Sequence, residues 1–190
     1  MFFNPNRRVC GFTLIELLIT LAIAAIAITV VVPGMSGLIQ NNRITTSTDD
    51  FIMSLNLARS EAVRRGTQVV VCKSTDLVNC TNDDKWDQGW IVFDDVDSSG
   101  SRTPASEPLL RAHAELKSGL QFGGQAVVAN AIAYDNNGFP IGITGDAAFT
   151  ICDSRGFGEY ARAILITPVG RLSITKATDD VVPDTVTACL

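Results

Sequence analysis

Residues 11–32 read GFTLIELLITLAIAAIAITVVV, and the organisation of the whole chain follows from this stretch. The apolar run from Phe12 to Val32 contains 21 residues and one ionised side chain, that of Glu16. A helix that rises about 1.5 Å per residue needs about 20 such residues to cross the hydrocarbon core of a bilayer. We therefore expect a membrane-spanning helix at residues 12–32, with the rest of the protein attached behind it.

Glu16 is the unusual residue of this helix. A carboxylate at the centre of a membrane span costs roughly 2.5–3.5 kcal/mol, although the cost is smaller near the helix N-terminus, where the helix dipole favours negative charge. Physics alone leaves two interpretations open. The side chain either reaches the membrane interface or has a buried partner of opposite charge.

The sequence Gly11-Phe12-Thr13-Leu14-Ile15-Glu16, after the short basic leader at residues 6–10, resembles the type IV pilin signature. The resemblance implies that prepilin peptidase cuts after Gly11 and that the new N-terminal Phe12 is N-methylated. It also implies that Glu16 pairs with the N-terminal amine of a neighbouring subunit during assembly. An ordinary secretory signal fits less well, because its cleavage site follows the apolar core and does not precede it.

The length and charge of the chain limit its function. The 190 residues divide into a leader at 1–11, the membrane helix at 12–32, an amphipathic helical half at 33–66 and a β-rich globular domain at 67–190. Loss of the leader leaves 13 basic against 20 acidic residues. This acidic balance disfavours strong non-specific binding to nucleic acid, which depends on phosphate neutralisation.

Five cysteines occur, of which Cys10 belongs to the leader. The other four are an even number in a domain expected to face the periplasm or cell exterior, where disulfides persist. Of the three pairings that four cysteines allow, we favour Cys72–Cys80, which closes a short loop, and Cys152–Cys189, which ties the C-terminus to an inner strand. A metal site is less favoured because neither spacing is C-x2–4-C.

The helix is expected to continue beyond the membrane segment in amphipathic form. Pilins tolerate a pair such as Pro33-Gly34 just past the membrane, so we interpret it as a kink and not as a stop. Two arginines followed by Gly66 predict the end of the helix. The apolar positions that recur at three- and four-residue spacing are Leu38, Ile39, Phe51, Ile52, Leu55, Ala58, Ala62 and Val63.

From Thr67 onward the pattern alternates and is rich in β-branched residues, which predicts strands. Hairpin turns are expected at residues 136–138 and 169–171, where Asn and Gly tolerate positive φ. A long helix followed by strands predicts an α+β, type IV pilin-like fold with the helix packed on an antiparallel β-sheet. The expected strands are Gln68–Lys73, one that follows Trp86 and ends at Phe93, Leu109–Ala114, Leu120–Phe122, Ala131–Tyr134, Ala148–Cys152, Ala161–Thr167 and Arg171–Thr175.

Residues 68–175 also resemble the FimT/FimU branch of minor pilins, which shares its globular domain with the H-type pseudopilin of type II secretion (GspH). The motifs that carry this resemblance are Cys72 with Cys80, Trp-x-x-Gly-Trp-Ile-Val-Phe at 86–93, Glu-Pro-Leu-Leu-Arg at 107–111, Asp-Asn-Asn-Gly at 135–138, Ile-Cys-Asp-Ser-Arg-Gly at 151–156 and Pro-Val-Gly-Arg at 168–171.

Three local groups were weighed as sites. Asp95, Asp97 and Ser99 form the D-x-D-x-S-G opening of a calcium loop, although position 12 of that loop is a serine and Glu107 follows it. The alternative for this segment is a solvated acidic turn. His113, the only histidine, has no nucleophile motif near it in sequence, which disfavours catalysis.

The third group is Arg155, Arg162 and Arg171, which we expect to converge at the C-terminal hairpins. Some FimT-type pilins bind DNA, and the resemblance places this at a Gly-Arg-x-Arg turn. Here the turn at residues 170–173 reads Gly-Arg-Leu-Ser and lacks the second arginine. In a DNA-binding pilin Arg171 would act through phosphate contacts. The alternative is that Arg171 is merely an exposed hairpin residue.

We therefore interpret the chain as a non-enzymatic minor pilin or pseudopilin without a cofactor. It would be held in the inner membrane by one pass, with its globular domain in the periplasm, and then enter a pilus or pseudopilus. The expected partners are other major and minor pilins or pseudopilins, the prepilin peptidase/methyltransferase, the inner-membrane assembly platform and membrane lipid. Type IV pilus assembly and type II secretion both stay open, and a DNA-binding competence pilin is the alternative.

Overall fold

The computed structural model describes residues 11–82, 85–117, 119–180, 182–183 and 189, with the backbone alone at 30–34. The chain forms two compact units, Met1–Gln40 and Asn41–Leu190. Helix α1 (Leu14–Arg65) begins in the first unit and ends in the second. The helix is continuous through Pro33-Gly34, so this pair does not stop it. It ends where Gly66 adopts a φ of 72°, as the sequence predicted.

The N-terminal part of α1 has no tertiary contacts that cover its side chains. Every residue from 11 to 29 is exposed. No helix in the described part of the chain is long and apolar enough to cross a membrane. The side chains at positions 30–32 of the expected membrane segment lie outside the described ones.

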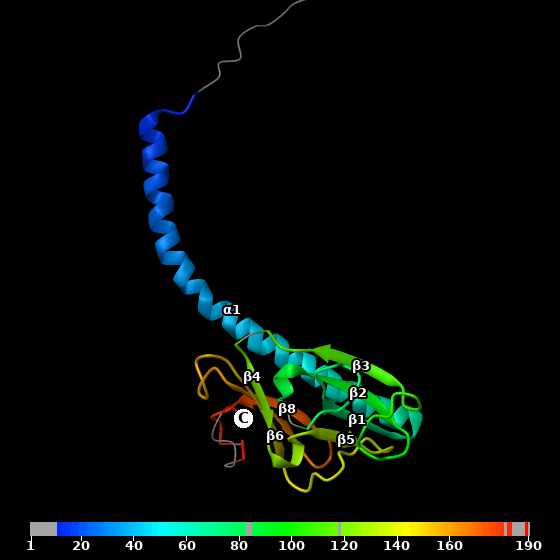
Figure 1. The fold of residues 1–190 in the computed structure, drawn as a ribbon. Coiled ribbons are helices and arrows are strands. Elements are labelled where there is room, and N and C mark those ends of the chain that lie inside the picture. The colour runs from blue at the N-terminus through cyan, green and yellow to red at the C-terminus, as the bar shows by residue number, and fades with distance from the viewer. Residues whose placement is uncertain (1–10, 83–84, 118, 181, 184–188, 190) are drawn as a thin grey trace, which may run out of the picture. The chain divides into compact units, whose positions relative to one another are not determined.

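The second unit contains two four-stranded antiparallel sheets (Figure 1), with strand orders β3-β2-β1-β5 and β4-β6-β7-β8. The sequence predicted each strand to within two residues at its ends, but it predicted one antiparallel array and not two separate sheets. The strands are β1 (Gln68–Lys73), β2 (Gly89–Asp95), β3 (Leu109–Ala114), β4 (Gln121–Gly124), β5 (Ala131–Tyr134), β6 (Ala147–Cys152), β7 (Arg162–Ile166) and β8 (Leu172–Lys176), with short 3-10 helices η1 (Trp86–Gln88) and η2 (Ala126–Val128).

The main core lies between residues 41–65 of α1 and the two sheets. Alternate residues of the strands face it, as the period-two pattern requires. The buried stripe of the helix consists of Ile44, Phe51, Leu55, Ala58 and Ala62. The steps of seven, four, three and four residues between these positions keep them on one helical face.

Four of the apolar helix positions expected in this stripe are not in it, and of these Ile52 is partly buried against the core. Leu38, Ile39 and Val63 are all about half exposed or more. Val63 follows the buried Ala62 directly, and adjacent residues of an α-helix point about 100° apart. Conversely, the sequence analysis omitted Ile44, which is 1% exposed.

Both predicted disulfides are present, Cys72–Cys80 and Cys152–Cys189. The first fastens the loop after β1 over the outer face of the first sheet, where Cys72 packs with Ile91 and Phe93. The second links Cys189 to Cys152 of β6, and Cys189 packs there with the cluster that contains Ala177 and Val182. Each disulfide therefore belongs to a small cluster of buried residues that is separate from the main core.

The two predicted turns differ in what they connect. The turn at 169–171 joins β7 to β8, with the Thr167 amide donating to the Arg171 carbonyl. The turn at 136–138 leads from β5 only to an isolated bridge between Tyr134 and Pro140. Because Pro140 has no amide proton, it cannot continue a regular ladder at this edge.

Candidate functional site

The N-terminal motif begins with a helix cap. The Glu16 amide donates a hydrogen bond to the Thr13 hydroxyl at 3.3 Å. Because α1 starts at Leu14, Thr13 is the N-cap and Glu16 the third helical residue, the spacing of a capping box. Thr13 was not among the residues predicted from the sequence, although Thr-x-x-Glu was the available signal.

The Glu16 side chain lies in an exposed apolar surface. Phe12 and Leu14 beside it are 81% and 77% exposed. No ion pair among the described residues includes Glu16. The Glu16 carboxylate therefore has no ionic partner within the described part of the chain.

Arg59 of α1 is a second residue that the sequence analysis missed as a structural contact. Its Nη1 donates to the Gly170 carbonyl at 2.7 Å and its Nη2 to the Val169 carbonyl at 3.1 Å. Gly170 has a φ of 76°, and a Cβ there would lie 3.1 Å from the Gly138 carbonyl oxygen. Glycine is therefore required where this hairpin approaches the other turn, and Arg59 attaches the hairpin to the helix.

We expect Arg59→Ala to destabilise the unit formed by residues 41–190 by about 1.5–3 kcal/mol, because two charge-assisted hydrogen bonds to carbonyls are lost. Urea unfolding followed by circular dichroism measures this. Arg64→Ala is the matched control, since the Arg64 side chain is 63% exposed and its ion pair among the described residues is with Glu61 of the same helix; it should leave the urea midpoint close to that of the wild type. Equal effects of the two substitutions would contradict the role of Arg59.

The three arginines proposed to converge do not do so. Arg155 and Arg162 meet at Tyr160: the Arg155 guanidinium lies 3.9 Å from the centre of the Tyr160 ring, and Arg162 Nη1 lies 3.4 Å from its carbonyl oxygen. Arg162 pairs across the sheet with Lys176, at the far end of the β7–β8 hairpin from Arg171. At about 3.3 Å per residue, Arg162 and Arg171 are about 16 Å apart.

The Arg155 guanidinium also forms an ion pair within the chain. Its Nη2 lies 2.6 Å from Asp153 Oδ2, and its hydrogen bonds hold the pKa of Asp153 below its usual range. Arg171 is exposed at the tip of the hairpin. Of the three arginines expected to converge, Arg171 alone lies at this tip, where the Arg59 guanidinium of the helix also donates to the Gly170 carbonyl.

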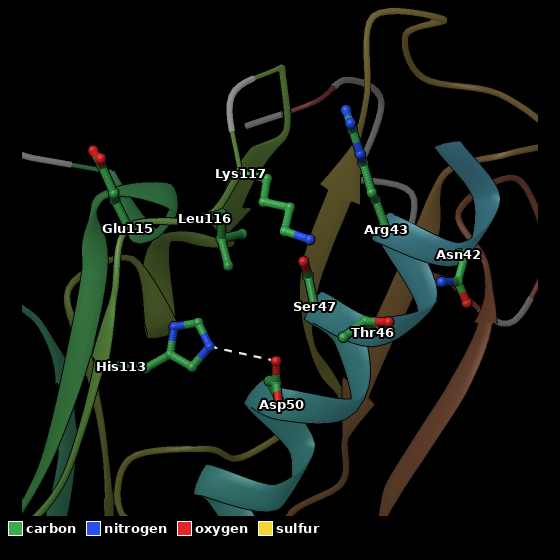
Figure 2. A pocket seen from close by; sticks show the side chains of 9 residues that line it. All are labelled: Asn42, Arg43, Thr46, Ser47, Asp50, His113, Glu115, Leu116 and Lys117. Carbon is green, nitrogen blue, oxygen red and sulfur yellow. Dashed lines mark hydrogen bonds and ion pairs between the residues drawn. The ribbon is translucent and has the colours of Figure 1, made fainter. Parts of the chain in front are cut away.

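His113 lies on β3 at the edge of a cavity of 220 Å³ (Figure 2). Its ring stacks on Trp90 with centroids 4.0 Å apart. Nδ1 lies 2.7 Å from the Ala114 carbonyl oxygen, which can only accept, so Nδ1 carries the proton. Nε2 lies 3.4 Å from Asp50 Oδ2, and no hydroxyl or thiol among the described residues hydrogen-bonds to the ring. The geometry is that of a packed surface histidine and contains no nucleophile–base pair.

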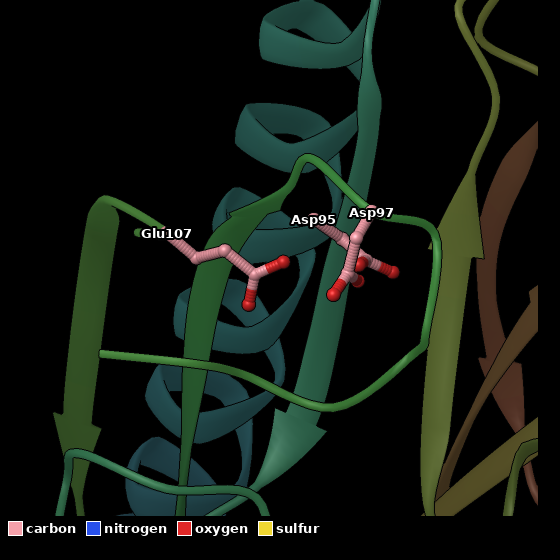
Figure 3. A group of neighbouring side chains, drawn as sticks. All are labelled: Asp95, Asp97 and Glu107. Atoms are coloured by element: carbon pink, nitrogen blue, oxygen red, sulfur yellow. The ribbon is translucent and has the colours of Figure 1, made fainter. Parts of the chain in front are cut away.

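The acidic segment after β2 contains a cluster different from the predicted one (Figure 3). Asp95, Asp97 and Glu107 each offer one oxygen within 4.8 Å of the others. Ser99 instead donates its amide to both aspartates and its hydroxyl to the Ser101 carbonyl. Burial raises the pKa of Asp95, whereas the interactions with Ser99 lower the pKa of Asp97.

The fold defines the class of protein. One long helix whose C-terminal half packs on antiparallel sheets is the α+β arrangement of type IV pilin-like proteins. Two crystal forms of the type IV minor pilin FimU from Pseudomonas aeruginosa are similar to it. One has a TM-score of 0.56 and 22% identity, covering 70% of this chain and 89% of that one. The other has a TM-score of 0.53 and 21% identity, covering 69% and 91%.

The sequence identifies the family. The family described as Type II transport protein GspH matches residues 47–170, and the prokaryotic N-terminal methylation motif matches residues 6–32. This chain belongs to the GspH family. The minor pseudopilin EpsH from the type 2 secretion system of Vibrio cholerae has a TM-score of 0.47 and 14% identity, covering 72% of this chain and 99% of that one. No curated protein matches the chain. The GspH family match and the N-terminal methylation motif confirm the predicted resemblance to GspH/FimU-type minor pilins.

Proposed function

We propose that the chain is a non-enzymatic minor pilin or pseudopilin that assembles with other pilins or pseudopilins in a priming or tip complex. The main support is the segment at residues 11–29, which is helical from Leu14 and exposed at every residue, whereas residues 41–190 have a core of their own. An apolar helix surface of this extent requires lipid or other helices around it. A filament subunit meets this requirement first with membrane lipid and later with the helices of neighbouring subunits.

Glu16 provides the assembly contact in this proposal. Cleavage after Gly11 creates an ammonium group on Phe12, and the carboxylate of Glu16 lies one helical turn away in sequence. In a low-dielectric filament core either charge alone is costly, whereas an ammonium and a carboxylate from neighbouring subunits neutralise each other. The pairing thus favours a subunit packed beside another one at a fixed axial offset.

The proposed location is the inner membrane, with the β-rich unit in the periplasm and later in a filament. The N-terminal methylation motif and the two disulfides support this, because disulfides persist in oxidising compartments. The proposal includes processing by prepilin peptidase/methyltransferase. It also includes transfer of the chain from the membrane into the filament by an inner-membrane assembly platform. The type IV pilus and the type II secretion pseudopilus are the two systems that the chain would serve.

Mass spectrometry of the chain from native membranes and from sheared surface filaments tests the proposed processing. We expect a mature chain that starts at Phe12 with one added methyl group. Gly11→Val is a control that should accumulate uncleaved, since it replaces the small residue before the cut. A chain from the filament or membrane fraction that retains Met1 would contradict the proposal.

A further inference from the structure

Two strand ends and a loop bring three carboxylates together (Figure 3). Asp95 is the last residue of β2, Asp97 lies in the loop that follows, and Glu107 stands just before β3. One oxygen from each lies within 4.8 Å of the other two. Asp95 and Glu107 are 0% and 2% exposed, so water does little to screen this concentration of negative charge.

Glu107 gives an independent indication that a ligand is bound there. Its Oε2 accepts the Thr103 amide at 2.5 Å. Its Oε1 is buried and has no hydrogen-bond partner among the described residues. The carboxylate points toward Asp95 and Asp97 (Figure 3). An unpaired buried charged group costs more than the roughly 1–3 kcal/mol of a neutral one, so a partner is expected at this oxygen.

No cationic side chain in the described part of the chain offsets these charges. None of its ion pairs includes Asp95, Asp97 or Glu107. Arg102, which lies in the same loop, donates instead to the backbone carbonyls of Glu107 and Val78. Buried carboxylates of this kind are neutralised by protonation or by a bound cation.

We propose that Asp95, Asp97 and Glu107 bind a calcium ion. Calcium takes oxygen ligands at about 2.3–2.6 Å, so two ligands on opposite sides of one ion are up to about 5 Å apart. The three oxygens lie within 4.8 Å of one another, so one such ion can reach all of them. Magnesium usually keeps several waters and is bound through one or two carboxylates, so a cluster of three carboxylates favours calcium.

The loop sequence is consistent with this choice of ion. Residues 95–100 have the D-x-D-x-S-G order of a calcium loop, and Gly100 adopts the φ of 75° that its sharp turn requires. Glu107 comes one residue later than the acid of an EF-hand loop. Its side chain nevertheless reaches the cluster, because residues 103–107 form a compact turn in which the Thr103 carbonyl accepts the Glu107 amide.

Isothermal titration of the EDTA-treated full chain in detergent micelles with calcium chloride tests the site. We expect one ion per chain with a dissociation constant on the order of 10⁻⁴–10⁻³ M, as in extracellular calcium modules, and binding of magnesium at least about tenfold weaker. Asp97→Asn and Glu107→Gln should each weaken calcium binding at least about tenfold, because each removes one of three charged ligands.

Asp146→Asn is the matched control, since Asp146 is an exposed aspartate outside the cluster; its calcium affinity should equal that of the wild type. Absence of saturable binding by the wild type, tighter binding of magnesium, or full affinity in Asp97→Asn would each overturn the proposal. Asp97 is exposed, so Asp97→Asn should fold. Its calcium affinity therefore tests the site even if Glu107→Gln fails to fold.

Discussion

Phe51→Ala is expected to destabilise the unit formed by residues 41–190 by about 3–5 kcal/mol, the usual cost of deleting a buried aromatic ring. Phe51 is 0% exposed. Its ring centre lies 4.7 Å from those of Phe122 and Phe149, 5.2 Å from that of Trp90 and 5.3 Å from that of Trp86. These rings come from η1, β2, β4 and β6, so one side chain of the helix contacts both sheets.

The size of the effect follows from this position. Truncation leaves a cavity at the junction of three layers, and surrounding rings fixed on separate strands have little freedom to collapse into it. A loss of this size is a large part of the roughly 5–15 kcal/mol that a domain has in total. We therefore expect a markedly lower urea midpoint and, at elevated temperature, a largely unfolded unit.

Urea unfolding of the fragment 41–190, followed by tryptophan fluorescence, measures the loss. Phe139→Ala is the matched control, because it makes the same chemical change at a side chain that is 47% exposed; it should cost less than about 1 kcal/mol. A loss for Phe51→Ala as small as that of the control would show that the aromatic cluster does not hold the helix to the sheets.

Glu16→Ala is expected to abolish, or nearly abolish, incorporation of the chain into filaments while leaving its membrane insertion intact. In the proposed function, its carboxylate neutralises the Phe12 ammonium of a neighbouring subunit. Without it, that ammonium is buried unpaired in the filament core, which costs roughly 3–5 kcal/mol by analogy with broken buried ion pairs. The loss converts to a decrease of more than about a hundredfold in the association constant at each such contact.

Glu16 also has the position of a capping-box residue with Thr13, and a second variant separates these roles. Glu16→Gln keeps a side chain that a capping box accepts but removes the charge. We expect it to fail in assembly as Glu16→Ala does. Rescue by glutamine would show that the residue acts by starting the helix and not by pairing charges.

Quantitative immunoblotting of sheared filaments against the membrane fraction provides the readout. Asp49→Ala is the control, an exposed acid of the same helix without a hydrogen bond among the described residues; it should assemble as the wild type does. Normal incorporation of Glu16→Ala would contradict the proposed assembly contact.

Local patterns were sufficient for the elements of this fold. The period-two runs predicted β1, β3 and β5 to the residue, and the spacing of cysteines favoured the pairing that the structure contains. The N-terminal motif, read with Gly11 and Glu16, predicted the class of protein that the family match confirms. These are contiguous signals, since helix and strand periodicity and a processing motif depend only on near neighbours in the chain.

Contacts between distant segments were beyond such reasoning. Arg59 meets Val169 and Gly170 across 110 and 111 residues, and no local pattern specifies which turn an arginine of the helix contacts. The division of the strands into two sheets depends on which edges pair, and the position of Arg171 far from Arg162 follows from the register of β7 and β8.

The sequence by itself determined the helix, the strands, the short-range disulfide Cys72–Cys80 and the N-terminal motif, because each depends on residue types at short spacing. The tertiary structure decided which side chains meet: Phe51 with rings of both sheets, and Glu107 with Asp95 and Asp97 in place of Ser99. Burial is the physical reason for this division. Periodicity shows which side chains of a helix or strand point inward. Only the packing of the elements determines which side chains lie opposite them and whether a buried charge has a partner.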